Sequence, residues 1–388
     1  MHPAGTSSRG TIPSAAFSQT PLRALAAFVD WLFLGDWRAR LATPPLRAAV
    51  LLLAVVLAAF LSFKAVGNQI TETNLLREDR VNLALYLDGT AYKPFVYRVL
   101  NPALIRLAED IGAPALLRAL PGPLAEKLPG WCADVAVTPA PTCDDVAAYV
   151  AVAGAECFAF LLLIYAVCLR MFGNPLVALF GLGFAFFGVN AVLLQHLSHV
   201  YDFGVLMFVT LLLLCLQRGW ALAFTLLLPL AFLTKETLIL YAGGFFLAEL
   251  RHRTPGRTAA LFLVQLASFA VIHGLVRAHF ADNPGLGHEY YLPQQIYFFT
   301  EQISISWLIP MTVALVLVFH RFSEKPLFLR RASIVIVPWF VLFLIGGVEK
   351  ELRVIFEVLP LILLLTIDSL VRLVPGIAPR TAASPQTG

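Results

Sequence analysis

The apolar run AAVLLLAVVLAAFLSF (residues 48–63) and the polar stretch TETNLLREDRVNLALYLDGTAYKPFVYRVLNP (residues 71–102) decide how this chain is organised. The apolar run is typical of a membrane-spanning helix. The polar stretch contains several carboxylates, including Glu72 and Asp88, then a Tyr97-Arg98 pair and then Asn101-Pro102, two residue types that favour the start of a helix. We interpret it as an active-site loop that combines an acid or base with a phosphate-binding cation on an exported face.

The composition is that of a membrane protein. Hydrophobic residues make up 59% of the chain and charged residues 13%, with a mean hydropathy of +0.80, whereas roughly 25% of residues are charged in soluble domains. The formal net charge of +4 is too small to indicate nucleic acid as a partner. We therefore predict an all-α, polytopic transmembrane helix bundle with one domain.

About ten membrane spans are expected. Three consecutive runs between residues 203 and 249 are short, at roughly 20 Å for 1.5 Å per residue, against a hydrocarbon core of ~30 Å. A polar turn at membrane depth is tolerated only where it is buried in protein or lines a cavity, so residues 234–236 should face a cavity between short paired helices. The expected spans are 48–63, 147–169, 175–194, 203–217, 220–233, 237–249, 259–276, 303–320, 333–347 and 353–372.

The basic residues indicate an orientation. Alternate threading of the spans places the arginine-rich connections in the cytoplasm, as the positive-inside rule requires, and both termini with them. Residues 64–145 then form a long exported loop, in which Cys132 and Cys143 are either disulfide-bonded or free thiols. The expected organisation is a disordered cytoplasmic tail (1–20), an interfacial helix (21–47), one transmembrane domain (48–375) and a second disordered tail (376–388).

The first exported loop holds the preferred catalytic candidates. Asp79, followed by Glu78, suits a general base or a metal ligand, and the alternative is a solvated turn of mixed charge. Tyr97 and Arg98 suit the capture of a phosphate at the membrane surface. The alternative for Arg98 is a side chain that only snorkels to lipid headgroups.

Two further exported connections carry candidate residues. His196, His199 and Asp202 have a spacing compatible with one helical face and a metal site, although interfacial histidines more often bond to water or backbone. Lys235 and Glu236 are candidates for an ion pair in the short turn, where Lys235 would also suit a lipid phosphate.

The last exported connection carries a series of charges. If it is helical, Glu349 and Glu357 lie one turn either side of Arg353 and hold it rigidly, while Glu351 points elsewhere. Such a series is either a structural clasp or a ligand contact through Arg353. Glu156, a lone ionisable residue inside the second span, is either functional or bonded in neutral form to a neighbouring helix.

These elements together resemble the GT-C superfamily of polytopic glycosyltransferases, which use polyprenyl-phosphate sugars. PFVYRVLNP (residues 94–102) is similar to the YRxLxP element of bacterial members, and EKELRVIFEVLP (residues 349–360) to their terminal E-x-R element. The resemblance implies a first-loop carboxylate as base or metal ligand, here Asp79 or a neighbour. The nearest equivalent of the family's acidic pair is Glu78-Asp79, inside a crowded run of charges.

The resulting hypothesis is a glycosyltransferase of the bacterial inner membrane, which moves a sugar from a polyprenyl-phosphate carrier to an acceptor on the extracytoplasmic face. Its expected partners are membrane lipid and the lipid-linked sugar donor, with no nucleic acid and no partner protein. No cofactor is required, and a divalent metal at Asp79, His199 and Asp202 stays open. The alternatives are a lipid or solute transporter or flippase, and a surface-polysaccharide polymerase or ligase.

Overall fold

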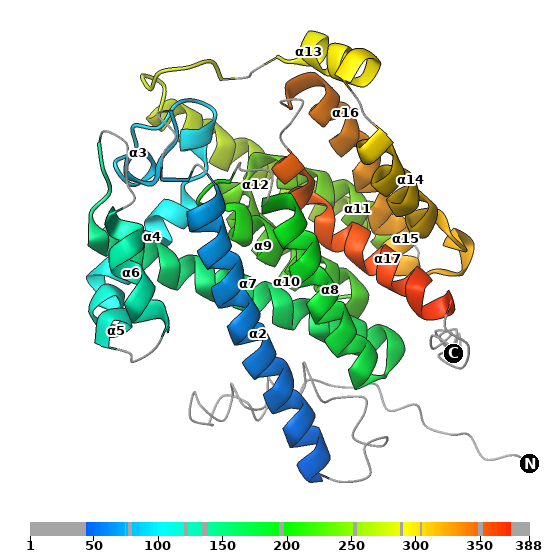
Figure 1. The fold of residues 1–388 in the computed structure, drawn as a ribbon. Helices are drawn as coiled ribbons and strands as arrows, with labels where there is room; N and C mark the ends of the chain where they lie inside the picture. Colours follow the sequence, from blue (N-terminus) through cyan, green and yellow to red (C-terminus); the bar gives the residue numbers. More distant parts are fainter. Residues whose placement is uncertain are drawn as a thin grey trace, which may run out of the picture. The chain divides into compact units, whose positions relative to one another are not determined.

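The computed structural model describes residues 44–73, 75–76, 80–119, 123–133, 139–193, 198–250, 254–287, 290–302, 305–347 and 352–373. These residues form helices and turns, with no strand among them, which confirms the all-α prediction (Figure 1). The chain divides into two units, residues 1–48 and 49–388, and the features described below belong to the second. The two predicted tails and nearly all of the predicted interfacial helix lie outside the described residues.

Among the described residues, five helical segments are long and apolar enough to cross a membrane. They are residues Ala48–Glu72 of α2 (Pro44–Glu72), α7 (Cys143–Phe172), α8 (Pro175–Leu193), α12 (Pro255–His279) and Leu327–Gly346, which joins α15 (Leu327–Ala332), η7 (Ser333–Val335) and α16 (Ile336–Gly346).

Shorter helices cover the remaining predicted runs. The three short runs between residues 203 and 249 correspond to α9 (Asp202–Arg218), α10 (Ala221–Thr234), and the 3-10 helix η4 (Glu236–Ile239) with α11 (Leu240–Glu249). The last two groups of helices are α13 (Leu292–Tyr297), η5 (Phe298–Gln302), α14 (Ile305–Phe319) and η6 (Phe322–Glu324), and then η8 (Leu352–Glu357) and α17 (Leu359–Leu373). Each predicted apolar run therefore lies mainly in helix.

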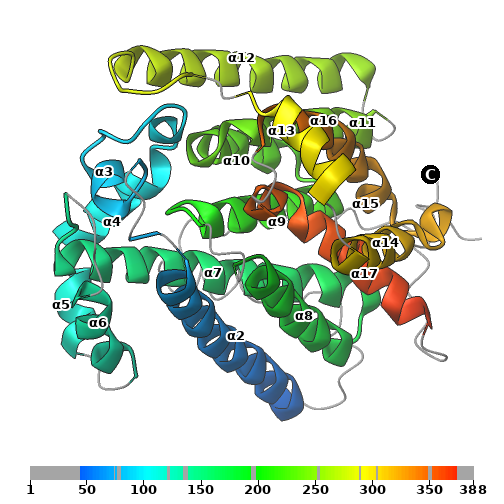
Figure 2. The ribbon, with the colours of Figure 1, turned by 45° about the horizontal axis from the view of Figure 1, so that its top comes forward.

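α7 is the central helix of the second unit. It contacts α8, α9 and the short helices α4 (Leu100–Asp110), α5 (Ala113–Ala119) and α6 (Pro123–Ala133), as Figure 2 shows. Its sequence signals both ends: Thr142 and Asp145 form a capping box at the start, and Gly173 takes a left-handed conformation (φ 64°) at the end. Tyr149, Phe160 and other large side chains of α7 are fully buried.

α12 lies at the periphery, next to α10 and α11 (Figure 2). Only 6% of its most apolar window is buried in protein, and Leu263, Val271 and Leu275 are exposed. An apolar helix with so little protein around it is suited to contact with lipid.

The first polar loop is more structured than the sequence indicated. α2 continues to Glu72, so this carboxylate ends a helix instead of opening the loop. The loop then forms α3 (Leu83–Leu87), the 3-10 helix η3 (Phe95–Tyr97), α4 and α5. The predicted capping role of Asn101 is wrong: α4 starts at Leu100, and the Asn101 side chain lies inside the protein.

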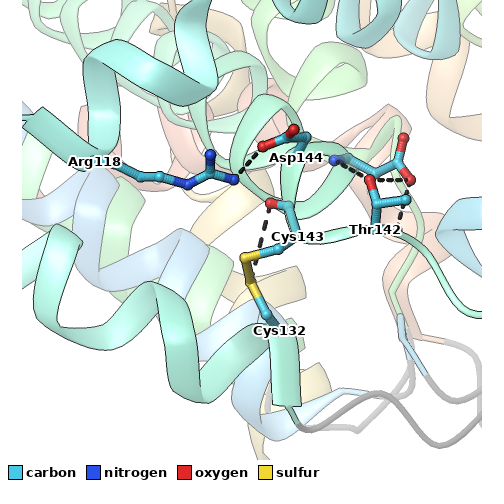
Figure 3. Close-up of a disulfide and its surroundings, with 6 residues drawn as sticks. Arg118, Cys132, Thr142, Cys143 and Asp144 are labelled. Atoms are coloured by element: carbon cyan, nitrogen blue, oxygen red, sulfur yellow. Dashed lines mark hydrogen bonds and ion pairs between the residues drawn. A yellow bond between two sulfur atoms is a disulfide. The ribbon is translucent and has the colours of Figure 1, made fainter.

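Cys132 and Cys143 form a disulfide, which decides between the two states left open above. The bond joins α6 to the first residue of α7, beside the Thr142 cap and an ion pair between Arg118 and Asp144 (Figure 3). The remaining cysteines, Cys157, Cys168 and Cys215, are buried thiols.

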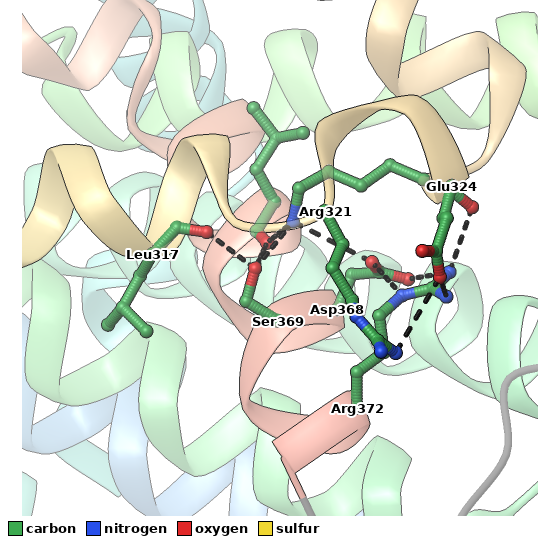
Figure 4. A network of polar contacts seen from close by, with 8 residues as sticks. Leu317, Arg321, Glu324, Asp368, Ser369 and Arg372 are labelled. Carbon is green, nitrogen blue, oxygen red and sulfur yellow. Dashed lines mark hydrogen bonds and ion pairs between the residues drawn. The ribbon is translucent and has the colours of Figure 1, made fainter.

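A buried charge network ties the connection after α14 to α17 (Figure 4). Lys325 Nζ donates to the Ser369 hydroxyl at 2.6 Å and to the Leu365 carbonyl at 2.7 Å, and it lies 3.6 Å from Asp368. Asp368 also accepts a 2.7 Å hydrogen bond from Arg372. Every polar group that this lysine brings inside is thereby compensated, so the network is a structural clamp.

Close packing of α7 against α9 depends on Gly204. A Cβ at this position would come within 2.9 Å of both Asn101 Oδ1 and Glu156 Oε1, so Gly204→Ala should overpack the interface and lower the free energy of unfolding by about 1–3 kcal/mol. Gly154→Ala is the matched control, since nothing lies within 4 Å of its Cβ. Thermal unfolding in detergent measures both; equal midpoints for the two variants would contradict this packing.

Candidate functional site

Only some of the predicted site residues can be placed. Glu78, Asp79, His196, Glu349 and Glu351 lie outside the described residues, as does the side chain of Arg353. The predicted catalytic pair is therefore untested. The described candidates are Tyr97, Arg98, His199, Asp202, Lys235 and Glu236.

Arg98 is buried, and its guanidinium is held by Glu236 and Tyr201. It follows η3, where its backbone N–H caps the last turn, and only 6% of the residue is exposed. Its Nε and Nη2 donate to the two carboxylate oxygens of Glu236 at 3.3 and 3.2 Å, and its Nη1 donates to the Tyr201 hydroxyl. The bidentate geometry fixes the plane of the guanidinium.

Lys235 forms the second buried ion pair. It interrupts the chain between α10 and η4 with an extended backbone (φ −159°, ψ 127°), and its Nζ lies 2.5 Å from Glu357 Oε1. Lys235 is 6% exposed and Glu357 3%. The turn expected at residues 234–236 therefore exists, and its lysine points to the start of the last helix.

Tyr201 connects the two pairs. Besides accepting from Arg98, its ring lies 4.5 Å from the Arg98 guanidinium carbon and 5.8 Å from Lys235 Nζ, both measured to the ring centroid. These distances suit cation–π interactions. We call Arg98, Tyr201, Lys235, Glu236 and Glu357 the charge cluster.

The charge cluster is formally neutral, with two cations and two carboxylates. Burial raises the pKa of Glu236, but the neighbouring Arg98 guanidinium more than offsets this and lowers it to about 2. Glu236 consequently stays ionised at any ordinary pH. Its side chain is 25% exposed, so among the four charged members it is the one most accessible to solvent.

One predicted pairing is replaced. Lys235 and Glu236, expected to pair with each other, instead form the salt bridges Lys235–Glu357 and Arg98–Glu236, because neighbouring side chains in an extended segment point in different directions. The predicted hold on Arg353 by Glu349 and Glu357 stays a prediction, because Glu349 and the Arg353 side chain lie outside the described residues; residues Leu352–Glu357 form a 3-10 helix.

His199 and Asp202 do not share a helical face, because α9 begins only at Asp202. Asp202 Oδ2 accepts hydrogen bonds from the Ser198 hydroxyl (2.9 Å) and the His199 backbone N–H (2.8 Å), and so organises the turn before the helix. The His199 ring packs against Phe95 and Tyr201, at centroid distances of 4.9 and 5.3 Å. Among the described residues, no three His, Cys, Asp or Glu side chains are grouped as metal ligands would be.

Tyr97 lies away from the charge cluster, although it adjoins Arg98 in sequence. Its ring contacts His273 (6.1 Å between centroids) and the Arg277 guanidinium (5.9 Å), both on α12. Tyr97 therefore anchors η3 to the peripheral helix, and only Arg98 of the predicted phosphate-binding pair enters the site.

A second layer of polar contacts supports the charge cluster. Asn101 Nδ2 donates to both carboxylate oxygens of Glu156, at 2.7 and 2.8 Å, and to the Val200 carbonyl at 3.3 Å. Glu156, the lone acidic residue of its span, is thus bonded to a neighbouring helix. The hydrogen bond from Asn101 to the Val200 carbonyl holds the backbone just before Tyr201.

Two members of the charge cluster were not predicted from the sequence in this role: Tyr201, and Glu357 as the partner of Lys235. Both residues lie shortly before an apolar helix, Tyr201 before α9 and Glu357 before α17. Only that shared position could have indicated their role. Comparison of the chain with protein-family models, curated proteins and solved structures found no match.

The Lys235–Glu357 pair allows a double-mutant test. Lys235→Met leaves Glu357 buried without its cation and should lower the free energy of unfolding by about 3–5 kcal/mol, whereas Lys235→Met with Glu357→Leu should recover most of that loss. Lys127→Met, at an exposed lysine of α6, is the control. Thermal unfolding in detergent gives the coupling energy between the two positions. If the two substitutions change the free energy of unfolding additively, the pair is not formed.

Proposed function

We propose that this protein is a membrane-embedded glycosyltransferase that moves a sugar from a polyprenyl-phosphate carrier to an acceptor on the extracytoplasmic side. The observation that carries the proposal is the charge cluster, in which the buried Arg98 and Lys235 and the half-buried Glu236, three of the predicted site residues, lie together at one end of an apolar helix bundle. Charged residues in such surroundings are costly and are typical of functional sites.

The charge cluster suits a departing phosphate because the Arg98 guanidinium is already oriented and its partner Glu236 is partly exposed. Arg98 is prevented from leaving its position by Tyr201, while its second partner, Glu236, is the more exposed one. A phosphate that displaced the Glu236 carboxylate would find a guanidinium already oriented for bidentate contact. Lys235, fixed by Glu357, would add a second positive charge nearby.

The reaction would be a direct displacement with inversion. An acceptor hydroxyl oxygen forms a bond to the anomeric carbon, the bond from that carbon to the phosphate oxygen breaks, and the phosphate leaves with the electron pair. A first-loop carboxylate, Asp79 or Glu78, takes the hydroxyl proton, and Arg98 and Lys235 stabilise the negative charge on the leaving group. The step itself requires no divalent metal, and Asp79 is the candidate metal ligand that stays open.

The disulfide supports an exported location for this end of the bundle. Disulfides persist in oxidising compartments, and Cys132–Cys143 lies at the start of α7. The Asn101–Glu156 and Arg98–Glu236 contacts connect that end to the charge cluster. Together with the positive-inside pattern, this favours about ten crossings of a bacterial inner membrane, cytoplasmic termini and an extracytoplasmic site.

One observation favours a second candidate, a transporter or lipid flippase. The break at Lys235 divides α10 from η4 and α11, and discontinuous helices line the substrate sites of many transporters. Transporters place such breaks near the membrane midplane, whereas the charge cluster lies at helix ends. A transferase therefore fits the arrangement better.

Transfer of sugar from radiolabelled polyprenyl-phosphate glucose and mannose, in membranes with matched protein levels, tests the proposal. Arg98→Lys keeps the charge but loses the bidentate contact, and Asp79→Asn removes the base; each should lower the transfer rate by about 100-fold or more. Arg257→Ala, at an exposed arginine of α12, should have no effect. Wild-type rates in both site variants would exclude this mechanism, and lipid movement without transfer would favour the flippase.

Labelling of single introduced cysteines tests the orientation. Thr90 and Ser323 are exposed, and the native cysteines give little background because two are bonded and three are buried. A membrane-impermeant maleimide added to intact cells should label Thr90→Cys and should label Ser323→Cys only after permeabilisation. The opposite pattern would invert the proposed topology.

A further inference from the structure

A polar pocket lies between α3, α4, α5 and the start of α7. Its volume is about 520 Å³, within the range of roughly 300–1,000 Å³ that is usual for small-molecule sites. The charged side chains in its wall are Asp88, Arg106, Glu109, Arg118, Asp144 and Asp145. Neither the predicted site nor the charge cluster contains any of them, apart from Asp88 as a first-loop carboxylate.

The charges of the pocket disfavour an acidic ligand. Arg106 contacts three carboxylates, with nitrogen–oxygen distances of 2.9 Å to Glu109, 2.9 Å to Asp145 and 3.3 Å to Asp88. Arg118 pairs with Asp144 (Figure 3). Two guanidinium groups therefore stand against four carboxylates, a formal charge of −2, so a phosphate or a sugar acid would meet net repulsion.

The same wall offers acceptors to a ligand that carries hydrogen-bond donors. Glu109 Oε1 is buried and receives no hydrogen bond from the described residues, while Oε2 accepts from Arg106. Burial and the neighbouring Asp145 carboxylate raise the pKa of Glu109, and together they outweigh the Arg106 guanidinium, which lowers it. A hydroxyl or ammonium group in the pocket would supply the missing donor after a small rotation of the carboxylate.

The wall is held in place by covalent and capping contacts. Asp145 Oδ2 accepts from the Thr142 backbone N–H at 2.6 Å and from its hydroxyl at 2.8 Å. The adjacent Cys143 is bonded to Cys132 of α6 (Figure 3). Planar carboxylate and guanidinium groups in fixed positions suit the paired donors and acceptors of neighbouring sugar hydroxyls, and binding would need little rearrangement.

We propose that this pocket binds a non-acidic saccharide, neutral or amino-substituted, through its hydroxyl and amino groups. Its role as the acceptor site rests on the proposed function. Asn101, next to Tyr201 through the Val200 carbonyl, and Glu109 are separated by about 12 Å along α4, at 1.5 Å per residue. Glu109 of the pocket and Asn101 beside Val200 therefore belong to the same helix.

Ligand-observed NMR with the purified full chain in nanodiscs, without any lipid-linked donor, tests the pocket. Methyl α-glucoside and glucosamine should bind, and glucuronate should bind at least about tenfold more weakly. Glu109→Ala should weaken binding of methyl α-glucoside by about ten-fold or more. Asp110→Ala, an exposed neighbour on α4 that is not in the wall, should leave it unchanged.

Folding of the variants is checked by thermal unfolding. If Glu109→Ala is unfolded, Glu109→Gln keeps the shape and an acceptor oxygen, and it should bind methyl α-glucoside while losing part of the discrimination against glucuronate. The proposal is overturned if none of the three sugars binds, if glucuronate binds as well as methyl α-glucoside, or if a folded Glu109→Ala binds normally. Saccharide binding without any transferase activity would support the proposed binding pocket and contradict the proposed reaction.

Discussion

A cation buried in so apolar a bundle is strongly destabilising unless a carboxylate lies beside it. Both cations of the charge cluster pair with a carboxylate from a distant part of the chain. Arg98 of the first loop meets Glu236 after α10, and Lys235 meets Glu357 before α17. These two pairs determine where η3, the α10–η4 break and η8 can lie. Tyr201 then joins the pairs and fixes their mutual orientation.

The comparison with Lys325 separates a structural ion pair from a candidate site. The Lys325 and Asp368 side chains are fully buried, and Arg372 and Ser369 complete their contacts. The charge cluster is buried to a similar degree except at Glu236, whose side chain is 25% exposed. Of the two networks, the charge cluster is therefore the one that a ligand can approach, and the approach is from the side of Glu236.

The sequence predicted the helices because apolar length is a strong signal in a membrane protein. It predicted the approach of Arg98, Lys235 and Glu236 because the topology expected from the positive-inside rule puts all three on one face. It could not predict their partners. Pairing depends on backbone direction within a few residues, such as the extended conformation of Lys235 and the 3-10 turn that carries Glu357. Tyr201 carries no signal in sequence, since a tyrosine at a helix end is ordinarily an interfacial anchor.

The separation of these partners along the chain has a consequence for synthesis. Glu236 follows Arg98 by 138 residues, and Glu357 emerges only after α11, α12, α14 and α16 have been made. Until then each cation must remain hydrated or find a temporary counter-ion, because it cannot enter an apolar environment alone. The segment that carries Glu357 therefore completes the charge cluster, and a chain that stops before it would leave Lys235 without its carboxylate.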